Sequence, residues 1–385
     1  MNTYRTILST ALAFAAPLVA QEQAARPLWN GVDFAGWHGQ RHVSPYELAA
    51  MDADARTKLR AEDDASMRAH WSIENGELVN DGEGAYLTTD VDHGDAEFSL
   101  EYRTVAKADS GVYLRGCPQV QIWDCTEAGG KWNLGADRGS GGLWNNEKHE
   151  RFPARCADKP FGEWNRLVIT NLGARVWVTL NGVLVTDGVV MENYWDRARP
   201  LPRTGPLQLQ THGGEIRFRN LAVRAIGAAE ANERLAARDS AGFAPIFDGR
   251  TFDGWRGDLG SYEIVNGEVR CRKGSGGVLF TDASYSDFVV RLAFRLPPAG
   301  NNGLAIRYPG EGDPAYTGFE VQVLDDSAPQ YAAAKPWQYH GSVYGVVAAE
   351  RGFLRPQGEW NVEEVTVRGS RVVVELNGTP IVDAD

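Results

Sequence analysis

The sequence predicts an all-β protein made of two β-sandwich domains in tandem. Three features support this prediction: short runs of alternating apolar and polar residues, Asn-Gly pairs between such runs, and a set of motifs that occurs twice. Alternation sends successive side chains of a strand to opposite faces, and Asn-Gly between two strands is a strong hairpin signal. A chain of 385 residues is also long enough for two domains.

The N-terminal segment has the features of a signal peptide. Arg5 supplies a positive charge, Ile7–Ala16 an apolar stretch and Leu18–Ala20 a cleavage site. We therefore expect residues 1–20 to be removed and the protein to be periplasmic or secreted, the alternative being a buried N-terminal helix. No later apolar run approaches the roughly 20 residues of a membrane span. The net charge of −12 disfavours nucleic-acid binding, because phosphate contacts need a basic face.

The same motifs appear in the same order in both halves of the chain, which indicates a duplicated domain. A repeat of this length is too long for a solenoid, whose repeats run about 20–50 residues. The matching segments are Pro27–Trp37 with Ala244–Trp255, Ile73–Leu78 with Ile264–Val269, Asp109–Arg115 with Asn301–Arg307, Val120–Asp124 with Val321–Asp325, Gly162–Asn165 with Gly358–Asn361, and Leu180–Gly182 with Leu376–Gly378.

Three differences between the copies set the expected domain organisation. The first copy carries a charged insertion between Trp37 and Trp71, with a serine cap and helix-forming residues, which we interpret as a solvated surface helix rather than a lid. An Ala-rich linker follows the first copy. The second copy has no counterpart of the LQLQTHG strand, so we expect a C-terminally truncated fragment with an exposed sheet edge. The expected boundaries are 27–225, 226–243 and 244–385.

The most informative stretch of the first copy is Asp109–Asp124, DSGVYLRGCPQVQIWD. Counting by twos places its aliphatic residues on a core face. The opposite face then carries an arginine, two glutamines and two aromatic residues, a composition that suits a sugar better than bulk water. These residues are Tyr113, Arg115, Gln119, Gln121 and Trp123. Later in the copy, Gln208, Gln210 and His212 share one face of another predicted strand.

Four cysteines are present, and export would permit a disulfide. One pair among Cys117, Cys125 and Cys156 is possible, and the spacing does not say which. A thiolate zinc site is not expected, because no CxxC or CxxC…HxxxH arrangement occurs.

With these motifs assembled, the chain resembles the 3-keto-disaccharide hydrolase family, formerly a domain of unknown function. The resemblance rests on WNGVDFAGW, WSIENGELV, DSGVYLRGCPQVQIWD, GSGGLWNN, GEWNRLVIT, LNGVLV, VMENYWDR and LQLQTHGGEIRFRNL in the first copy, and more loosely on FDGRTFDGW, NNGLAIR, FEVQVLDD, GSVYG and GEWN in the second. It implies two concanavalin A-like jelly-roll sandwiches in tandem. It also implies hydrolase or lyase activity on glycosides whose C3 hydroxyl has been oxidised to a ketone.

A C3 ketone acidifies the C2 proton, so a base can remove it and the C1 substituent leaves by elimination; adding water back gives net hydrolysis. Such a site needs a base, a group that stabilises the enolate oxygen and an acid for the leaving oxygen. We predict His212 as the base, with Glu101 as its rival, and Arg115 at the enolate oxygen. The structural alternatives are that His212 is hydrogen-bonded to a turn and that Glu101 and Arg115 each form a salt bridge.

Eight residues are predicted to bind substrate, either through hydrogen bonds or by stacking on the sugar. The alternative is a polar strand face for the amides and core packing for the tryptophans. They are Tyr113, Gln119, Gln121, Trp123, Trp144, Asn145, Lys148 and Gln210. No cofactor is required by the sequence, although His149, His212 and Glu101 could ligate a divalent metal.

The expected function is therefore an exported enzyme that cleaves 3-keto-glycosides from the first copy. The alternative function is a tandem carbohydrate-binding protein, because the same fold serves lectins and binding modules. The expected partner is a carbohydrate or glycoside substrate; no partner protein is predicted.

Overall fold

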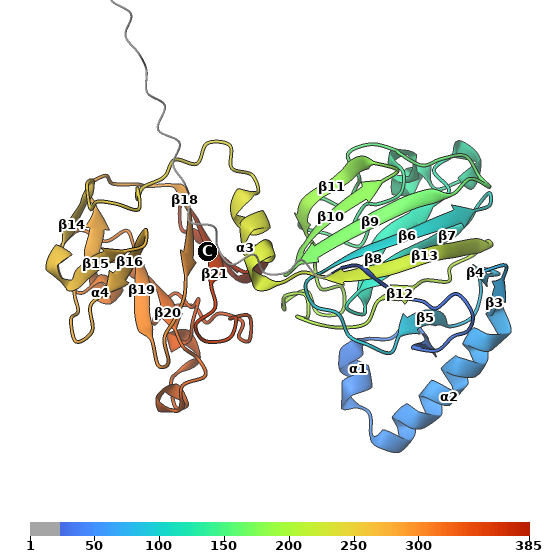
Figure 1. Cartoon of the computed structure of the whole chain (residues 1–385), viewed down its shortest axis with the longest axis horizontal. Helices are drawn as coiled ribbons and strands as arrows, with labels where there is room; N and C mark the ends of the chain where they lie inside the picture. Colours follow the sequence, from blue (N-terminus) through green and yellow to red (C-terminus); the bar gives the residue numbers. More distant parts are fainter. Residues whose placement is uncertain (1–23) are drawn as a thin grey trace, which may run out of the picture.

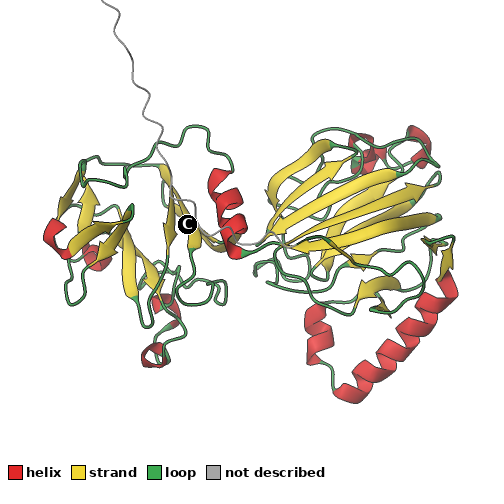
Figure 2. Ribbon diagram, viewed as in Figure 1, coloured by secondary structure: helices red, strands yellow, loops and turns green. Residues whose placement is uncertain are grey.

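The computed structural model describes residues 24–385, so the predicted signal peptide lies outside the described part of the chain. The chain forms two strand-rich units with one short helix, α3 (Ala228–Ala237), between them (Figure 1). Strands and loops account for most of both units, and the longest helix borders the first one (Figure 2). Among residues 24–385 no helix combines the length and apolar character needed to cross a bilayer.

The first unit is a sandwich of two antiparallel sheets, as the sequence predicts. The larger sheet has the order β11-β10-β9-β6-β13-β4-β3, with β1 also paired to β13, and the smaller has the order β2-β5-β12-β7-β8. The strands of the larger sheet are β1 Arg26–Pro27, β3 Trp71–Glu74, β4 Glu77–Asn80, β6 Ala96–Thr104, β9 Asn165–Leu172, β10 Arg175–Leu180, β11 Val183–Val190 and β13 Ile216–Ala225. Those of the smaller are β2 Trp37–Gln40, β5 Tyr86–Thr89, β7 Asp109–Leu114, β8 Cys117–Trp123 and β12 Gln208–Leu209.

The core lies between these two sheets and confirms the predicted alternation in β7 and β8. Val112, Val120 and Ile122 are completely buried and share one hydrophobic cluster with Leu100 and Tyr102 of β6. Burying a large aliphatic side chain contributes about 1.5–3 kcal/mol. The alternate residues of β7 and β8 therefore lie on the outer face of the smaller sheet.

The four Asn-Gly pairs make two-residue hairpin turns. At Asn75-Gly76 both residues have positive φ, 52° and 76°, as the type I′ turn requires. Equivalent turns join β10 to β11, β15 to β16 and β22 to β23, at Asn181-Gly182, Asn266-Gly267 and Asn377-Gly378.

The predicted insertion is helical and consists of α1 Pro45–Ala50 and α2 Ala53–His70. Ser44 and Asp52 cap the two helices by accepting hydrogen bonds from the backbone of Tyr46 and Ala55. Most of α2 faces solvent, but the helix is seated against β2 at Gly39, where a Cβ atom would lie 2.1 Å from the carbonyl oxygen of Asp63. Only glycine allows this contact between strand and helix.

The expected linker is largely a helix, α3 Ala228–Ala237, which lies between the two units (Figure 1). Its Ala231 and Leu235 are fully buried with Leu172 of the first unit and Val362 of the second. A flexible linker would leave these side chains in water. The Ala-rich composition of 226–243 therefore encodes a packed connection rather than a tether.

The second unit repeats the strand sequence of the first, but its sheets are divided. In the first unit β12 joins β5 to β7, and β13 joins β4 to β6. Among the described residues of the second unit no strand occupies either place, and the ladders are β14-β17, β15-β16, β19-β20 and β18-β21-β22-β23. Their bounds are β14 Trp255–Gly257, β15 Tyr262–Val265, β16 Glu268–Cys271, β17 Leu279–Thr281, β18 Phe288–Phe294, β19 Asn301–Ile306, β20 Phe319–Leu324, β21 Asn361–Arg368, β22 Arg371–Leu376 and β23 Thr379–Ala384, with a short helix α4 Pro314–Thr317.

Short 3₁₀ turns complete the structure. They are η1 Glu127–Gly129, η2 Trp132–Leu134, η3 Ala136–Arg138, η4 Leu259–Ser261, η5 Pro329–Tyr331 and η6 Pro336–Gln338. The first three follow one another in the long connection after β8.

Candidate functional site

A carboxylate on the outer face of the smaller sheet gathers three polar side chains from separate parts of the first unit. Asp109, the first residue of β7, lies with Oδ2 2.9 Å from His212 Nδ1 and also contacts Lys131 Nζ. Its Oδ1 accepts a hydrogen bond of 2.7 Å from the amide of Gln121. The Asp109 side chain is only 8% exposed, whereas that of His212 is 60% exposed. The buried carboxylate thus holds an accessible imidazole.

Both ionisable members of this pair have shifted pKa values. The hydrogen bond with Asp109 raises the pKa of His212 above 6.5, against the opposing effects of burial and of Lys131. Burial on its own raises the pKa of Asp109, but the hydrogen bonds from His212 and Lys131 outweigh it and lower that pKa. Asp109 is therefore ionised at neutral pH. Since Nδ1 faces the carboxylate, Nε2 of His212 is the nitrogen left to exchange a proton.

The same carboxylate, together with the backbone carbonyls of Ser110 and Ile122, which also accept from the Gln121 NH₂, fixes the orientation of two amides. An ionised carboxylate only accepts hydrogen bonds, so Gln121 must point its NH₂ toward Asp109. The Gln121 carbonyl oxygen then accepts from the NH₂ of Gln119 at 2.7 Å. This series of hydrogen bonds leaves Gln119 Oε1 as a buried acceptor with no donor among the described residues. A sugar hydroxyl is a suitable donor for such an atom.

Gly111 makes room for this chain of amides. A Cβ atom at Gly111 would lie 2.2 Å from Oε1 of Gln119, which is too close for any real contact. We expect Gly111→Ala to push the Gln119 amide out of place and to lower the free energy of unfolding by about 1–3 kcal/mol, the usual cost of overpacking. Gly94→Ala is the matched control, because its Cβ would meet only atoms at 3.6 Å or beyond. Equal urea midpoints for the two variants would contradict the expectation.

His42 forms part of the site and was missed by the sequence analysis. It lies between β2 and α1, and its Nδ1 is 3.2 Å from the hydroxyl of Tyr113. Its ring also packs against that of Trp195, with the ring centroids 4.7 Å apart and the planes tilted by 41°. Burial, and then the charge of His212, lower the pKa of His42, so it is neutral at pH 7. In the sequence, the one indication of this residue is a histidine within the insertion, three residues before its first helix begins at Pro45.

Tyr113 and Gln210 lie on the same outer face, as predicted. The amide of Gln210 donates to the Tyr113 hydroxyl at 3.4 Å, and Gln210 Oε1 is a second buried acceptor without a donor among the described residues. Burial, followed by the neighbouring Tyr86, raises the pKa of Tyr113. Its hydroxyl therefore stays protonated and can donate a hydrogen bond.

Arg115 does not reach this cluster, which corrects the sequence-based placement. The ladder of β7 and β8 shifts register after Val112, and Arg115 itself has a φ of 56°, so it belongs to the turn rather than to the strand. Its guanidinium donates to the carbonyl of Pro202 at 2.9 Å and to Asp95 at 3.2 Å. It is a buried structural cation, and Lys131 is the cation beside Asp109.

Glu101 also lies elsewhere. Glu101 lies on the face of β6 opposite the buried Leu100 and Tyr102. Because β6 belongs to the larger sheet, that face is the opposite side of the sandwich from His212. There Glu101 accepts from Arg219 at 2.6 Å and from Asn220 at 3.1 Å. Two of the three predicted catalytic side chains are thus separated from His212.

The remaining predicted binding residues contact neither Asp109 nor His212. Trp123 is buried and pairs edge-on with Trp144 at 6.2 Å. Trp144 borders an open cavity of about 570 Å³ built by the connection after β8. The backbone carbonyl oxygen of Asn145 accepts a hydrogen bond from Arg197, and the backbone N–H of Lys148 donates to Glu192.

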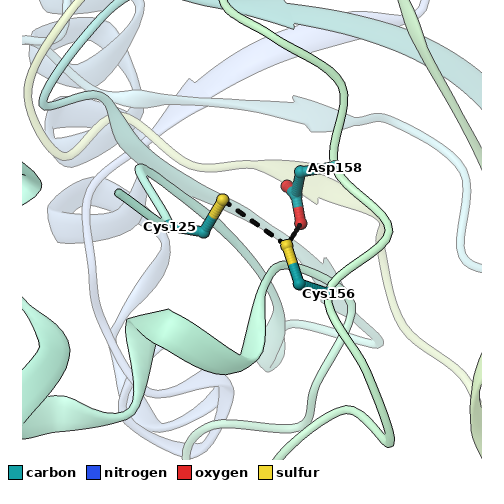
Figure 3. A group of neighbouring side chains, drawn as sticks. All are labelled: Cys125, Cys156 and Asp158. Atoms are coloured by element: carbon teal, nitrogen blue, oxygen red, sulfur yellow. Dashed lines mark hydrogen bonds between the residues drawn. The ribbon is translucent and has the colours of Figure 1, made fainter. Parts of the chain in front are cut away.

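A possible metal-binding group occurs away from His212. In the described residues, Cys125, Cys156 and Asp158 offer three ligand atoms within 4.8 Å of one another. Figure 3 shows the two thiols facing each other, with Sγ atoms 3.6 Å apart, and Asp158 beside Cys156 at 3.5 Å. His149, His212 and Glu101, the metal ligands considered from the sequence, form no such group: His149 borders a second cavity of about 330 Å³ near Arg175.

The fold and the site together define the class of the protein. It is a two-sheet β-sandwich whose outer face carries amides, aromatic rings and an oriented histidine, the groups that suit a hydroxyl-rich ligand.

The chain belongs to the 3-keto-alpha-glucoside-1,2-lyase-like domain family, whose model matches residues 24–224 and 242–385. The resemblance seen in the sequence, and its occurrence in two segments, are therefore confirmed. A 3-keto-disaccharide hydrolase of Bacteroides thetaiotaomicron is 26% identical over 186 residues, which are 42% of this chain and 64% of that protein. The match thus spans less than two thirds of that relative.

Solved structures also match the chain. One, from Parabacteroides distasonis and provisionally named a glycosyl hydrolase, is 18% identical with a TM-score of 0.39, over 53% of this chain and 94% of that chain. A carbohydrate-binding module of Bacillus subtilis is 9% identical with a TM-score of 0.27, over 40% of this chain and 91% of that chain.

Proposed function

We propose that the protein is an exported enzyme that cleaves 3-keto-glycosides by removing the C2 proton and expelling the C1 substituent. The observation that carries this proposal is the Asp109–His212 pair, in which a buried carboxylate orients an exposed imidazole. Family membership supports the substrate class, and the unsatisfied acceptors on Gln119 and Gln210 support a hydroxyl-rich ligand.

In the proposed reaction His212 Nε2 takes the C2 proton, and the C2–H electron pair forms the enolate of the C3 ketone. Asp109 stabilises the imidazolium that results. Lys131 supplies positive charge for the enolate oxygen, the role first expected of Arg115. The enolate then re-forms the ketone and expels the C1 oxygen, which takes the proton back from the His212 imidazolium. The products are an alcohol and a C1=C2 enone; addition of water across that bond gives net hydrolysis.

The proposal assigns the reaction to the first unit. The aligned motifs place Asn301 where the first copy has Asp109, and Ala305 where it has Tyr113. Glu320 replaces Gln119 in the same alignment. An amide in place of the carboxylate carries no negative charge and could not raise the pKa of a histidine beside it.

The direct test is to incubate the mature protein with a methyl 3-keto-glucoside and to follow methanol release together with enone absorbance. Methanol with enone indicates a lyase, and methanol without enone indicates a hydrolase. Binding of the 3-keto-glycoside without turnover would overturn the enzyme assignment and favour the alternative of a carbohydrate-binding protein.

The pH dependence of kcat/KM provides a second test. Because Asp109 raises the pKa of His212, the base form accumulates only above pH 6.5, and the acidic limb of the profile should lie above that value. In Asp109→Asn the charge is lost, so the pKa of His212 falls and the limb should move to lower pH while the rate drops. A limb that stays in place would show that another group is the base.

A further inference from the structure

We propose that Cys125, Cys156 and Asp158 bind one zinc ion, with a water molecule as the fourth ligand. Cys125 follows β8, and the other two residues precede β9, so the ion would tie together the two ends of the connection between these strands. Figure 3 shows the three side chains turned toward one another, and their ligand atoms all lie within 4.8 Å of each other. This site is separate from the proposed reaction.

The distances between the ligand atoms are those of a tetrahedral zinc site. With zinc–sulfur bonds of about 2.3 Å and zinc–oxygen bonds of about 2.0–2.2 Å, such an ion holds two sulfur atoms roughly 3.8 Å apart, and a sulfur and an oxygen atom roughly 3.5 Å apart. The Sγ atoms of Cys125 and Cys156 are 3.6 Å apart, and Cys156 Sγ lies 3.5 Å from Asp158 Oδ2. A disulfide requires a separation of about 2.05 Å, so the thiols have the spacing of two ligands of one ion.

Hydrogen bonds from the first unit hold Asp158 in place as a ligand. Its Oδ2 accepts from the backbone N–H of Ser140 at 2.8 Å, and its Oδ1 accepts from the hydroxyl of the buried Tyr102 at 3.3 Å. An ionised carboxylate has about four lone-pair sites, so these two contacts leave room for a bond to a metal. Supporting hydrogen bonds of this kind orient the ligands of metal sites.

Gly139 allows the connection to fold back onto two of the ligands. Its φ is 92°, and a Cβ atom at this position would lie 2.7 Å from Asp158 Oδ2 and 2.7 Å from the Cα atom of Cys156. A larger residue would therefore displace the carboxylate or the cysteine. The backbone beside the three side chains is thus built around their present positions.

The chemistry of the group selects a soft divalent cation. The side-chain contacts of Asp158 within the described residues are with the Ser140 N–H, the Tyr102 hydroxyl and the Cys156 thiol, none of which is a cation. Two thiolates and a carboxylate suit zinc, whereas Ca²⁺ and Mg²⁺ select oxygen ligands. Cys125 is half-buried and Cys156 is exposed, so an ion and its water can enter from solvent.

The bound ion would stabilise a connection that has little regular structure of its own. Between Cys125 and Cys156 the chain forms the three short 3₁₀ turns η1, η2 and η3 and otherwise loops. This segment carries Lys131 to Asp109. A metal that binds the folded connection and not the open one shifts the equilibrium toward the folded form.

The test uses the whole chain, reduced and stripped with a chelator, and zinc as the probe. Elemental analysis after gel filtration should find one zinc ion per chain. Cys156→Ser should weaken zinc binding by more than about 100-fold, because loss of a supporting contact alone costs about 10–100-fold. Cys271→Ser is the matched control, since that thiol lies in the second unit and contacts the backbone carbonyls of Arg272 and Ser275. Its zinc affinity should equal that of wild type.

Two further measurements distinguish loss of a ligand from loss of the fold. Cobalt in place of zinc should give a thiolate-to-metal charge-transfer absorption in wild type and in Cys271→Ser, and Cys156→Ser should lose most of it. Zinc should also slow tryptic cleavage after Arg138, which is exposed within the connection, in wild type but not in Cys156→Ser.

Failure of the reduced wild type to retain zinc, or equal zinc affinities of wild type and Cys156→Ser, would overturn the site. So would peptide mapping of protein isolated without reductant, if it recovers residues 125 and 156 joined by a disulfide. None of these readouts requires cleavage of a glycoside, so they stand whether or not the proposed function is correct.

Discussion

His212→Asn is expected to lower kcat for 3-keto-glycosides by about 10²–10⁴-fold, the range in which a general base contributes. The imidazole is the exposed partner of a buried carboxylate, so its removal leaves no group at that place to accept the C2 proton. Steady-state rates of methanol release measure the effect. Because the His212 side chain is more exposed than buried, the fold should tolerate the change.

His93→Asn is the control for this prediction. His93 lies in the same unit but contacts Phe98 of the core rather than Asp109. Its replacement should change stability more than kcat. If His93→Asn and His212→Asn lose activity to the same degree, the loss reflects the fold and not a missing base. An unchanged kcat in His212→Asn would remove the proposed mechanism altogether.

The largest expected effect on stability is that of Glu375→Ala. Glu375 on β22 accepts from Arg175 of the first unit at 2.8 Å and 2.5 Å, and from Arg238 after α3 at 2.5 Å. Its side chain is 6% exposed and that of Arg238 only 5%. The variant would leave Arg175 without a carboxylate partner and Arg238 with Glu364 alone, at 3.3 Å, and breaking a buried ion pair costs about 3–5 kcal/mol.

Hydrogen exchange of the α3 amides, together with the urea midpoint, measures this loss. Glu268→Ala is the control, since the pair of Glu268 and Arg295 is solvent-exposed and such pairs contribute about 0–1 kcal/mol. The methyl 3-keto-glucoside should be cleaved at an almost normal rate by folded Glu375→Ala. If exchange in α3 is no faster in Glu375→Ala than in Glu268→Ala, these charges do not hold the units together.

The alternation of residues predicted the architecture of the first unit and most of one site face. The outer face of the smaller sheet carries Gln119, Gln121, Tyr113 and Gln210. They lie there because successive side chains of a regular strand point to opposite faces. The same rule was wrong for Arg115, whose positive φ places it in a turn. Counting by twos holds only while the chain remains a strand.

Other site residues could not be predicted from local pattern at all. Glu101 alternates with buried residues along its strand, which indicates an outer face. The sequence does not say whether that face belongs to the larger or the smaller sheet. His42 and Lys131 come from irregular segments with no period. The segment between β2 and α1 brings His42 to the Tyr113 hydroxyl, and the connection after β8 brings Lys131 to Asp109. The expected linker became a helix because its alanines meet apolar residues of both units.

The row from Asp109 through Gln121 to Gln119 has a direction that three acceptors set together. The NH₂ of Gln121 donates to the Asp109 carboxylate and to the backbone carbonyls of Ser110 and Ile122. Because a carbonyl oxygen can only accept, the Gln121 amide keeps its orientation even when Asp109 is protonated. The acceptor that Gln119 presents at the far end of the row is thus independent of the charge beside His212, so binding of a hydroxyl there and proton transfer at His212 can depend on pH separately.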